Sequence, residues 1–436
     1  MPEARLLLAR YVVPVRPRGV VLEDHAVLME GGKITSILPA NEAVVRHPDA
    51  TPERFDHHVL LPGLINMHTH SPMSLLRGYA DDLALETWLR DHIWPAEQRW
   101  LSPEFVADGT RLAVAEMIRC GTTCFNDMYF FPDVTASVVE EVGLRACIGL
   151  PIIEFPTAWA RDFEAYIAKA LQVHDALRGC ALVSTALAPH AAYTVTDDML
   201  ARVAELSATL ELPVHIHLLE IAWEARHSLQ EYGMGPLQRL LDVGLLNERL
   251  IAVHMAHLQD EDIRLLAESG VNVVHCPESN LKLASGFCRV ADLLAAGVNV
   301  ALGTDGAASN NDLDLLAELR TAALLAKGVA ADPCALSAGE ALELVTINAA
   351  QALGLGETLG SIEVGKQADL CAVDLDRPQS QPVHHVISQL VYAATSAQVS
   401  DVWVGGRRLL EGGALTALDL PQVIERAECW RQRMVG

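Results

Sequence analysis

Eight short apolar runs, each followed by a longer amphipathic segment, dominate the middle of this chain. Apolar runs that alternate with amphipathic segments are typical of repeated βα units. Eight such units over roughly 300 residues predict an α/β fold of the (β/α)8 TIM-barrel type. The predicted strands are Val59–Met67, Cys120–Met128, Leu144–Ile153, Ala181–Ala188, Leu212–Leu219, Arg249–His254, Val271–Cys276 and Val298–Thr304.

The two ends of the chain have a different pattern. Residues 1–61 alternate short β-like runs with turn signals, and they contain no convincing helix. After Gly360 the helical pattern stops and strand-like alternation returns. A chain of 436 residues also exceeds what one hydrophobic core usually serves. We therefore predict a barrel over residues 62–360 and a small β domain that combines residues 1–61 with residues 361–436.

Polar side chains mark the ends of several predicted barrel strands, which is where barrel enzymes place their active sites. They belong to residue types that bind metals or transfer protons. In chain order they are His68 and His70, His190, His215, His217 and Glu220, His254, and Asp305.

The pattern at these strand ends predicts a metal site. His68 and His70 are two residues apart on a strand, so both side chains point to the same face. His215 could share the face of His217, but the His-x-x-Glu spacing to Glu220 favours His217 as a ligand. Imidazole and carboxylate ligands without thiolates suit zinc, while Fe²⁺ or another divalent ion also fits. The predicted ligands are His68, His70, His217 and Asp305.

The number of metals follows from the lysines. A second metal in this chemistry usually requires a carboxylated lysine as a bridge. The five lysines are elsewhere, since none ends the third or the fourth predicted strand. We therefore expect one ion per subunit, with an open position for water.

Charge and cysteine content restrict the partners and the compartment. The net charge of −24, without a basic stripe, disfavours nucleic acid as a partner. Nine scattered cysteines without a Cys-x-x-Cys pair are typical of reduced thiols. The N-terminus is unlike a signal peptide, and no run of about 20 apolar residues occurs. We expect a cytoplasmic protein that binds neither nucleic acid nor membrane.

Several segments together resemble the amidohydrolase superfamily. Within it, they look most like the 5'-methylthioadenosine/S-adenosylhomocysteine deaminases, and the likeness covers nearly the whole chain. The segments that carry it are residues 62–78, 121–128, 188–190, 275–283 and 303–311. The resemblance implies a zinc-dependent enzyme that hydrolyses the 6-amino group of an adenine nucleoside to an inosine-type product and ammonia.

Two other interpretations stay open at this point. Triazine hydrolases and guanine deaminases share the metal ligands, so a triazine or guanine aminohydrolase or chlorohydrolase is the alternative. A catalytically silent scaffold is a more remote alternative, and it predicts missing ligands. All four predicted ligands are present.

The resemblance also implies roles for individual residues. Trp88 and Glu97 match the residues that line the nucleoside pocket, with Glu97 on the ribose hydroxyls, and His190 matches a residue placed against the purine. Glu220 is the candidate proton shuttle, while His254 and Asp305 take or orient the proton of the attacking water. A homo-oligomer is also implied.

The 5'-side of the nucleoside depends on the loop after the third predicted strand. Between Leu150 and Ala170 this loop has one arginine, Arg161. The residues around it are the acidic Glu154, Asp162 and Glu164 and the apolar Phe155, Trp159 and Phe163. We therefore expect an uncharged methylthio group to be preferred, with Arg161 as the partner for a carboxylate tail. The natural 5'-substituent, the metal used in the cell, the oligomeric state and the roles of His257 and His275 stay open.

Overall fold

The computed structural model describes residues 4–435 and contains two eight-stranded sheets. One sheet is entirely parallel, and its strands follow each other in chain order from β5 to β12. Each of the eight predicted strands overlaps one of them. They are β5 (Leu64–Thr69), β6 (Thr122–Met128), β7 (Arg145–Ile152), β8 (Val183–Pro189), β9 (Val214–Leu218), β10 (Leu250–His254), β11 (Asn272–His275) and β12 (Asn299–Leu302).

The last parallel strand lies beside the first, which closes the sheet into a (β/α)8 barrel. At this seam the backbone N–H of Asp305 donates to the carbonyl of His68 over 2.9 Å. The side chain of Asn66 reaches across the same seam to the backbone and hydroxyl of Thr304. The seam therefore brings the ends of β5 and β12 together, although His68 and Leu302, the last residue of β12, are 234 positions apart in the chain. The predicted fold class is confirmed.

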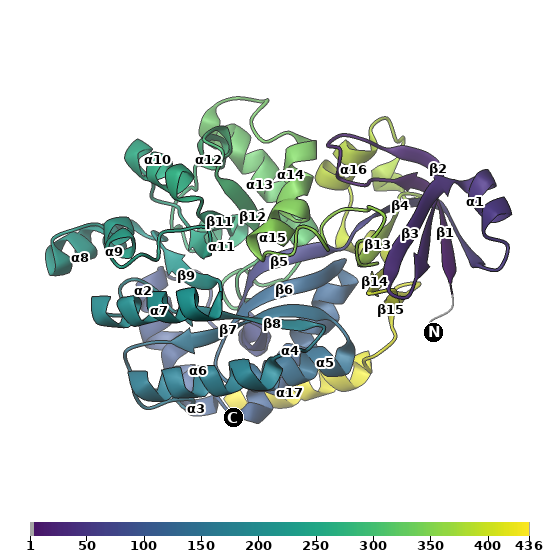
Figure 1. The fold of residues 1–436 in the computed structure, drawn as a ribbon. Helices are drawn as coiled ribbons and strands as arrows, with labels where there is room; N and C mark the ends of the chain where they lie inside the picture. Colours follow the sequence, from purple (N-terminus) through teal and green to yellow (C-terminus); the bar gives the residue numbers. More distant parts are fainter. Residues whose placement is uncertain (1–3, 436) are drawn as a thin grey trace.

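Helices surround the barrel and follow its strands (Figure 1). Local sequence fixes several of their ends. Ser102, for example, caps α4 by accepting from the N–H of Phe105, and Ser337 with Glu340 forms a capping box on α14. The helices after the strands are α4 (Pro103–Arg119), α5 (Pro132–Val142), α6 (Phe163–Leu177), α7 (Asp197–Leu210), α8 (Ala222–Tyr232), α9 (Pro236–Asp242), α10 (Asp260–Ser269), α11 (Pro277–Lys282), α12 (Val290–Ala295), α13 (Leu315–Ala330), α14 (Ala338–Leu344) and α15 (Ile347–Ala352).

The segment between β5 and α4 covers one end of the barrel with short helices. It contains a 3-10 helix (Ser71–Leu76), α2 (Leu85–Thr87), a π-helix (Trp88–Ile93) and α3 (Trp94–Trp100). Pi-helical turns are rare in proteins, and those that do occur are often found at functional sites. This segment carries both Trp88 and Glu97.

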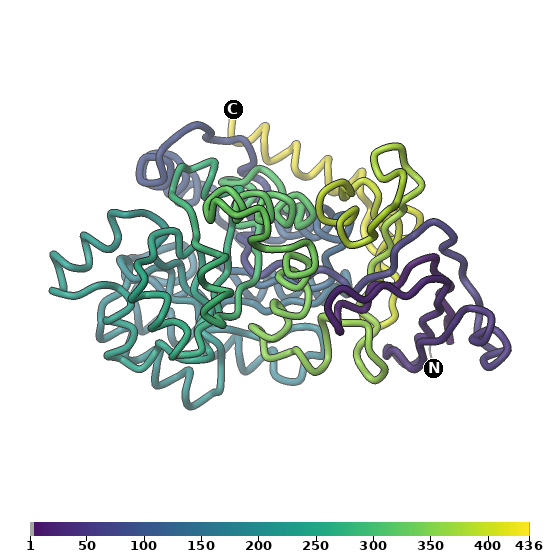
Figure 2. Tube along the Cα trace, turned by 90° about the horizontal axis from the view of Figure 1, so that it is seen from above, coloured from purple at the N-terminus to yellow at the C-terminus, as the bar shows by residue number. Residues whose placement is uncertain are grey.

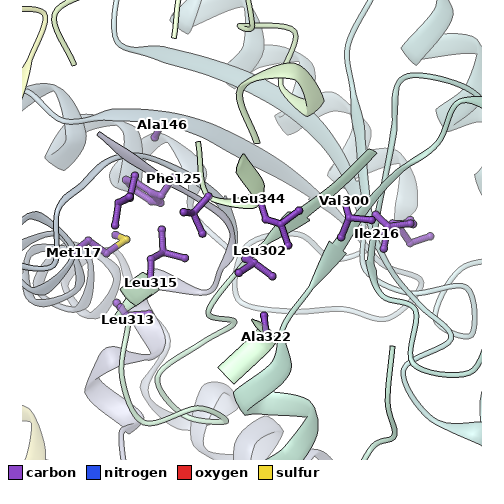
Figure 3. Packing of buried hydrophobic residues seen from close by; sticks show 14 of the residues in the cluster. Met117, Phe125, Ala146, Ile216, Val300, Leu302, Leu313, Leu315, Ala322 and Leu344 are labelled. Atoms are coloured by element: carbon purple, nitrogen blue, oxygen red, sulfur yellow. The ribbon is translucent and has the colours of Figure 1, made fainter. Parts of the chain in front are cut away.

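The main core lies between the strands and the surrounding helices. Figure 3 shows Phe125 of β6 near Met117 of α4, and Leu302 of β12 near Leu315 of α13. A second, smaller cluster fills the interior of the barrel with Ile65, Val253 and neighbouring residues, and α15 packs against it. Burial of these apolar surfaces is the main favourable contribution to folding.

The second sheet joins the two ends of the chain, as predicted. Its order is β16-β15-β14-β13-β4-β1-β2-β3, and β4 pairs antiparallel with β13 where the two ends meet. Figure 2 shows the purple N-terminal segment and the yellow-green part of the C-terminal segment together at one end of the molecule, while the bright yellow C-terminal helix runs back along the barrel. The strands are β1 (Arg5–Val12), β2 (Leu22–Glu30), β3 (Lys33–Pro39), β4 (Thr51–Pro62), β13 (Leu370–Asp374), β14 (Val399–Val404), β15 (Arg407–Glu411) and β16 (Ala414–Leu415).

Two details of the sequence interpretation are corrected. The first predicted strand is divided between the sheets, since Val59–Pro62 ends β4 and the barrel strand begins at Leu64. Gly63 makes the change of sheet, and a Cβ there would lie 2.1 Å from the side chain of Thr123. Residues 1–3 and 436, at the outer ends of the predicted β domain, lie outside the described residues.

Helices also occur in both terminal segments, where none was expected. They are α1 (Ala40–Arg46), 3-10 helices at Pro378–Ser380 and Ser396–Gln398, α16 (Val386–Tyr392) and α17 (Leu420–Val435). Helix α17 is mostly polar, and it is held by contacts with the barrel helix α4 that its own sequence does not reveal. Its Arg426 and Trp430 both bond Asp108. Among residues 4–435, the structure shows no helix long and apolar enough to cross a membrane.

Candidate metal centre and substrate cavity

The four predicted ligands converge on one point at the C-terminal ends of the strands. The Nε2 atom of His217 lies 3.2 Å from Nε2 of His68 and 3.3 Å from Nε2 of His70. Oδ1 of Asp305 lies 3.3 Å and 3.2 Å from the same two histidine atoms. Ligands about 2.0–2.1 Å from a tetrahedral zinc are about 3.3 Å apart, so this donor set fits one zinc ion.

The other nitrogen of each ligand histidine has a hydrogen-bond partner. Nδ1 of His70 contacts the carbonyl of Met128 at 2.6 Å, and Nδ1 of His217 contacts the carbonyl of His190 at 2.6 Å. Nδ1 of His68 lies 2.9 Å from Nε2 of His215. A carbonyl can only accept, so it fixes the proton on Nδ1 of His70 and of His217 and leaves their Nε2 lone pairs free for a metal.

Asp305 is held just as firmly. The hydroxyl of Ser279 donates to Oδ2 at 2.7 Å, and the N–H of Gly306 donates to Oδ1 at 2.8 Å. Burial alone would raise the pKa of Asp305, but its contacts with His68 and His70 lower this pKa well below the usual range. Asp305 and His254 also have positive φ angles of 63° and 74°, a costly backbone conformation that recurs at functional sites.

His254 and Glu220 lie beside this centre. Nε2 of His254 is 3.7 Å from Oε2 of Glu220, and Oε1 of Glu220 accepts from the hydroxyl of Ser285 at 3.2 Å. Burial raises the pKa of Glu220 to about 8, so that the carboxyl holds a proton at neutral pH. His254 lies close enough to His68 and His217 to serve as an alternative ligand. The predicted ligand set rests on the 3.2–3.3 Å contacts among His68, His70, His217 and Asp305.

The centre lies at the floor of a cavity of about 670 Å³, a volume suited to a small organic ligand. His70, His217, Glu220, His254 and Asp305 all line it. So do Trp88, Glu97 and His190, three residues that the resemblance placed on the substrate. Farther from the centre the lining is largely apolar and includes Leu89, Trp94, Ile153, Phe155 and Pro156.

Glu97 has a partner that the sequence did not reveal. The hydroxyl of Tyr129 donates to Oε1 of Glu97 at 2.6 Å. Burial raises the pKa of Glu97, and the hydrogen bond from Tyr129 opposes part of this rise. The resulting pKa is about 7. Tyr129 directly follows β6, and its place at a strand end was the signal that could have identified it.

The structure does not bring Arg161 to the cavity. Its side chain is 88% exposed and pairs with Asp162, the residue that caps α6. Arg90 is the arginine among the described residues that line the cavity. Its guanidinium donates a hydrogen bond to the carboxylate of Asp91. Phe155, from the same loop as Arg161, does line the cavity, so the apolar part of the loop argument keeps its structural basis.

His257 and His275, whose roles were open, have different surroundings. Nε2 of His257 contacts the carbonyl of Ser285 at 2.6 Å, and Ser285 in turn bonds Glu220. His275 is buried at the end of β11, and its Nδ1 has no hydrogen-bond partner among the described residues. His257 thus helps to hold the segment that contacts Glu220.

A closed (β/α)8 barrel with this donor set at the C-terminal ends of its strands defines a metal-dependent hydrolase. The chain belongs to the amidohydrolase family, whose model matches residues 59–409. The expected enzyme class, a hydrolase of the amidohydrolase type, is confirmed.

Individual relatives give a finer comparison. The chain is 48% identical to the 5-methylthioadenosine/S-adenosylhomocysteine deaminase of Teredinibacter turnerae, over 98% of this chain and 96% of the relative. It superposes with a TM-score of 0.96 on an adenosine deaminase from Xanthomonas campestris with bound zinc, at 53% identity and 99% coverage of both chains. Atrazine chlorohydrolase from Arthrobacter aurescens shares the fold, with a TM-score of 0.91 at 24% identity and coverage of 98% and 99%.

Proposed function

We propose that this enzyme is a zinc-dependent hydrolytic deaminase of adenine nucleosides, with 5'-methylthioadenosine as its preferred substrate. The observation that carries the proposal is the convergence of His68, His70, His217 and Asp305 within 3.2–3.3 Å at the floor of a cavity. The names of the two most similar relatives described above support the substrate class.

The proposed chemistry divides between the ion and the protein. A zinc ion held by the four ligands would lower the pKa of a water molecule from about 16 to about 7. Asp305 and His254 would accept or orient the proton of the attacking water, whose oxygen would add to C6 of the purine. Glu220 would give its proton to the adjacent ring nitrogen, then take the proton of the new C6 hydroxyl and pass it to the departing amine. The C6–N bond breaks, ammonia leaves, and a carbonyl remains at C6.

The cavity wall positions the nucleoside in this proposal. Glu97 accepts hydrogen bonds from the ribose hydroxyls, Trp88 packs against the nucleoside, and His190 lies toward the purine. The apolar outer lining, which includes Trp94 and Phe155, favours an uncharged methylthio group over a charged amino-acid tail. We also expect a homo-oligomer that works in the cytoplasm without nucleic acid or membrane, in keeping with the net charge of −24.

A substrate panel tests this function. Ammonia release is measured with 5'-methylthioadenosine, S-adenosylhomocysteine, adenosine, guanine and an amino-triazine, and chloride release is measured with a chloro-triazine. The proposal predicts the highest kcat/KM with 5'-methylthioadenosine. A higher kcat/KM with S-adenosylhomocysteine would overturn the 5'-preference. Turnover of guanine or a triazine alone would overturn the substrate class.

The position of Arg161 suggests two substitutions that can be measured with the same substrates. Because its side chain lies outside the cavity, Arg161→Ala should leave kcat/KM for both nucleosides nearly unchanged. If a carboxylate tail is bound, Arg90 is the cation that lines the cavity, and Arg90→Ala should lower kcat/KM for S-adenosylhomocysteine more than for 5'-methylthioadenosine. A selective loss in Arg161→Ala would instead restore Arg161 as the partner of the tail.

A further inference from the structure

His215 differs from the other groups that support the ligand histidines because it is a side chain. His70 and His217 are each held by a backbone carbonyl, which substitution cannot remove. His68 is held by the imidazole of His215, with 2.9 Å between Nδ1 of His68 and Nε2 of His215. This is therefore the one of the three supporting contacts that can be changed without changing a ligand.

The proposed zinc ligation fixes the direction of this hydrogen bond. Nε2 of His68 lies among the other proposed ligands, 3.3 Å from Oδ1 of Asp305 and 3.2 Å from Nε2 of His217, and it must offer its lone pair to the ion, so its proton is on Nδ1. Nδ1 of His68 then donates, and Nε2 of His215 must accept. His215 consequently carries its own proton on Nδ1.

A role in packing alone does not explain His215. The residue is completely buried, and its Nδ1 has no hydrogen-bond partner among the described residues. A buried polar group without a partner is unfavourable, and an apolar side chain of similar size would avoid this. His215 is two residues before His217 on β9, so both side chains face the barrel interior, with His215 placed to reach His68.

We infer that His215 is a positioning residue of the metal centre, which accepts the Nδ1 proton of His68 and thereby aims Nε2 of His68 at the ion. The inference rests on the proposed metal site. Loss of such a supporting hydrogen bond typically lowers metal affinity about 10- to 100-fold.

The test compares two substitutions of similar length, His215→Gln and His215→Met. The glutamine amide oxygen can accept the proton of His68, whereas the methionine thioether is a weak acceptor. His275→Met is the matched control, because His275 is an equally buried histidine on a nearby strand whose Nδ1 also has no hydrogen-bond partner among the described residues. The zinc dissociation constant is measured by competition with a chelator, and the Tm of each metal-free protein checks its fold.

We expect His215→Met to weaken zinc binding about 10- to 100-fold, while His215→Gln and His275→Met stay within about threefold of the wild type. Equal zinc affinity in His215→Met and the wild type would overturn the inference, as would an equal loss in His275→Met. A wild type that binds no zinc would overturn the proposed function, and this inference with it.

A second measurement does not depend on whether the variants fold. Nitrogen-15 NMR of the histidine rings in the zinc-loaded wild type reports which ring nitrogen carries each proton. We expect the Nδ1–H tautomer at both His68 and His215. An Nε2–H tautomer at His215 would overturn the inference, because that nitrogen could not then accept a hydrogen bond.

Discussion

The hydroxyl of Tyr129 donates a hydrogen bond of 2.6 Å to the carboxylate of Glu97 at the wall of the cavity. Met128, the preceding residue, accepts the Nδ1 proton of His70 through its carbonyl. Two consecutive residues at the end of β6 thus hold a proposed metal ligand and the proposed ribose-binding group. This fixes the distance between the reacting centre and the sugar, which is the kind of positioning that accelerates a reaction between bound groups.

Glu97→Gln should weaken the binding of nucleosides that carry both ribose hydroxyls. A hydrogen bond to a charged group contributes about 1.5–3 kcal/mol, so KM for 5'-methylthioadenosine should rise about 10- to 100-fold. The control substrate is 2',3'-dideoxyadenosine, on which the loss should be much smaller. Equal losses on both substrates would show that Glu97 does not bind the ribose.

The same substitution should change how stability depends on pH. Burial raises the pKa of Glu97 from 4.5 to about 7, so the folded chain keeps a proton that the unfolded chain releases between these values. The stability that Glu97 contributes therefore falls as the pH rises through this window, and it stays low above it. Glutamine cannot ionise.

Thermal or denaturant unfolding of metal-free Glu97→Gln and wild type checks this at about pH 5 and about pH 8. The variant should gain on the order of 2 kcal/mol relative to the wild type at the higher pH, after allowance for the partial exposure of Glu97 in the cavity. A difference that does not change with pH would mean that the carboxyl has an ordinary pKa.

Glu220→Gln should keep the metal and lose most of the turnover. Glu220 is outside the proposed ligand set, and an amide cannot carry the proton that the reaction requires. General acid–base groups contribute about 10²–10⁴-fold to the rate, so kcat should fall by about this factor. Zinc content measured on the same sample is the control. A decrease of kcat of less than tenfold, with full zinc content, would assign the proton transfer to another group.

Lys282 and Asp81 should act together on substrate binding. Lys282 of α11 pairs with Asp81 at 2.6 Å, and Asn311 donates to the same carboxylate at 3.2 Å. Asp81 lies on the segment that brings Trp88 and Glu97 over the cavity, so loss of the pair should raise KM by about two- to fivefold, the range of a partly exposed ion pair.

A double-mutant cycle measures this coupling. Asp81→Asn, Lys282→Met and the double variant should all raise KM to a similar extent, because either single change already breaks the pair. Asp82→Asn, at the exposed neighbouring acid, is the matched control and should leave KM unchanged. Additive effects of the two single changes would show that the pair does not hold the segment.

Those parts of the fold and of the site that depend on a local sequence pattern could be predicted from the sequence. His68, His217 and Asp305 could be found because each follows an apolar run, and barrel strands place such residues at one end. The contacts that depend on residues far apart in the chain could not be found. Tyr129 reaches Glu97 across 32 positions, and β4 meets β13 across more than 300.

The terminal helices and Arg161 show the same limit. Helix α17 buries Val423 and Trp430, with most of its surface polar, so its sequence alone gives a weak apolar face. Arg161 was the arginine of the expected loop, but Asp162 caps α6 beside it and the two side chains pair in solvent. The composition of the loop after the third strand predicted that it would favour an uncharged group. Only the path of its backbone showed which of its side chains face the cavity.

Titration of the metal-free enzyme with zinc tests the central claim most directly. Ammonia release from 5'-methylthioadenosine is measured after each addition, with the chain concentration held constant. We predict that activity is absent without metal, rises in proportion to added zinc and levels off at about one ion per chain, as the four converging ligands and the lack of a bridging lysine require. Full activity in the metal-free enzyme, or a plateau at two ions per chain, would contradict the account.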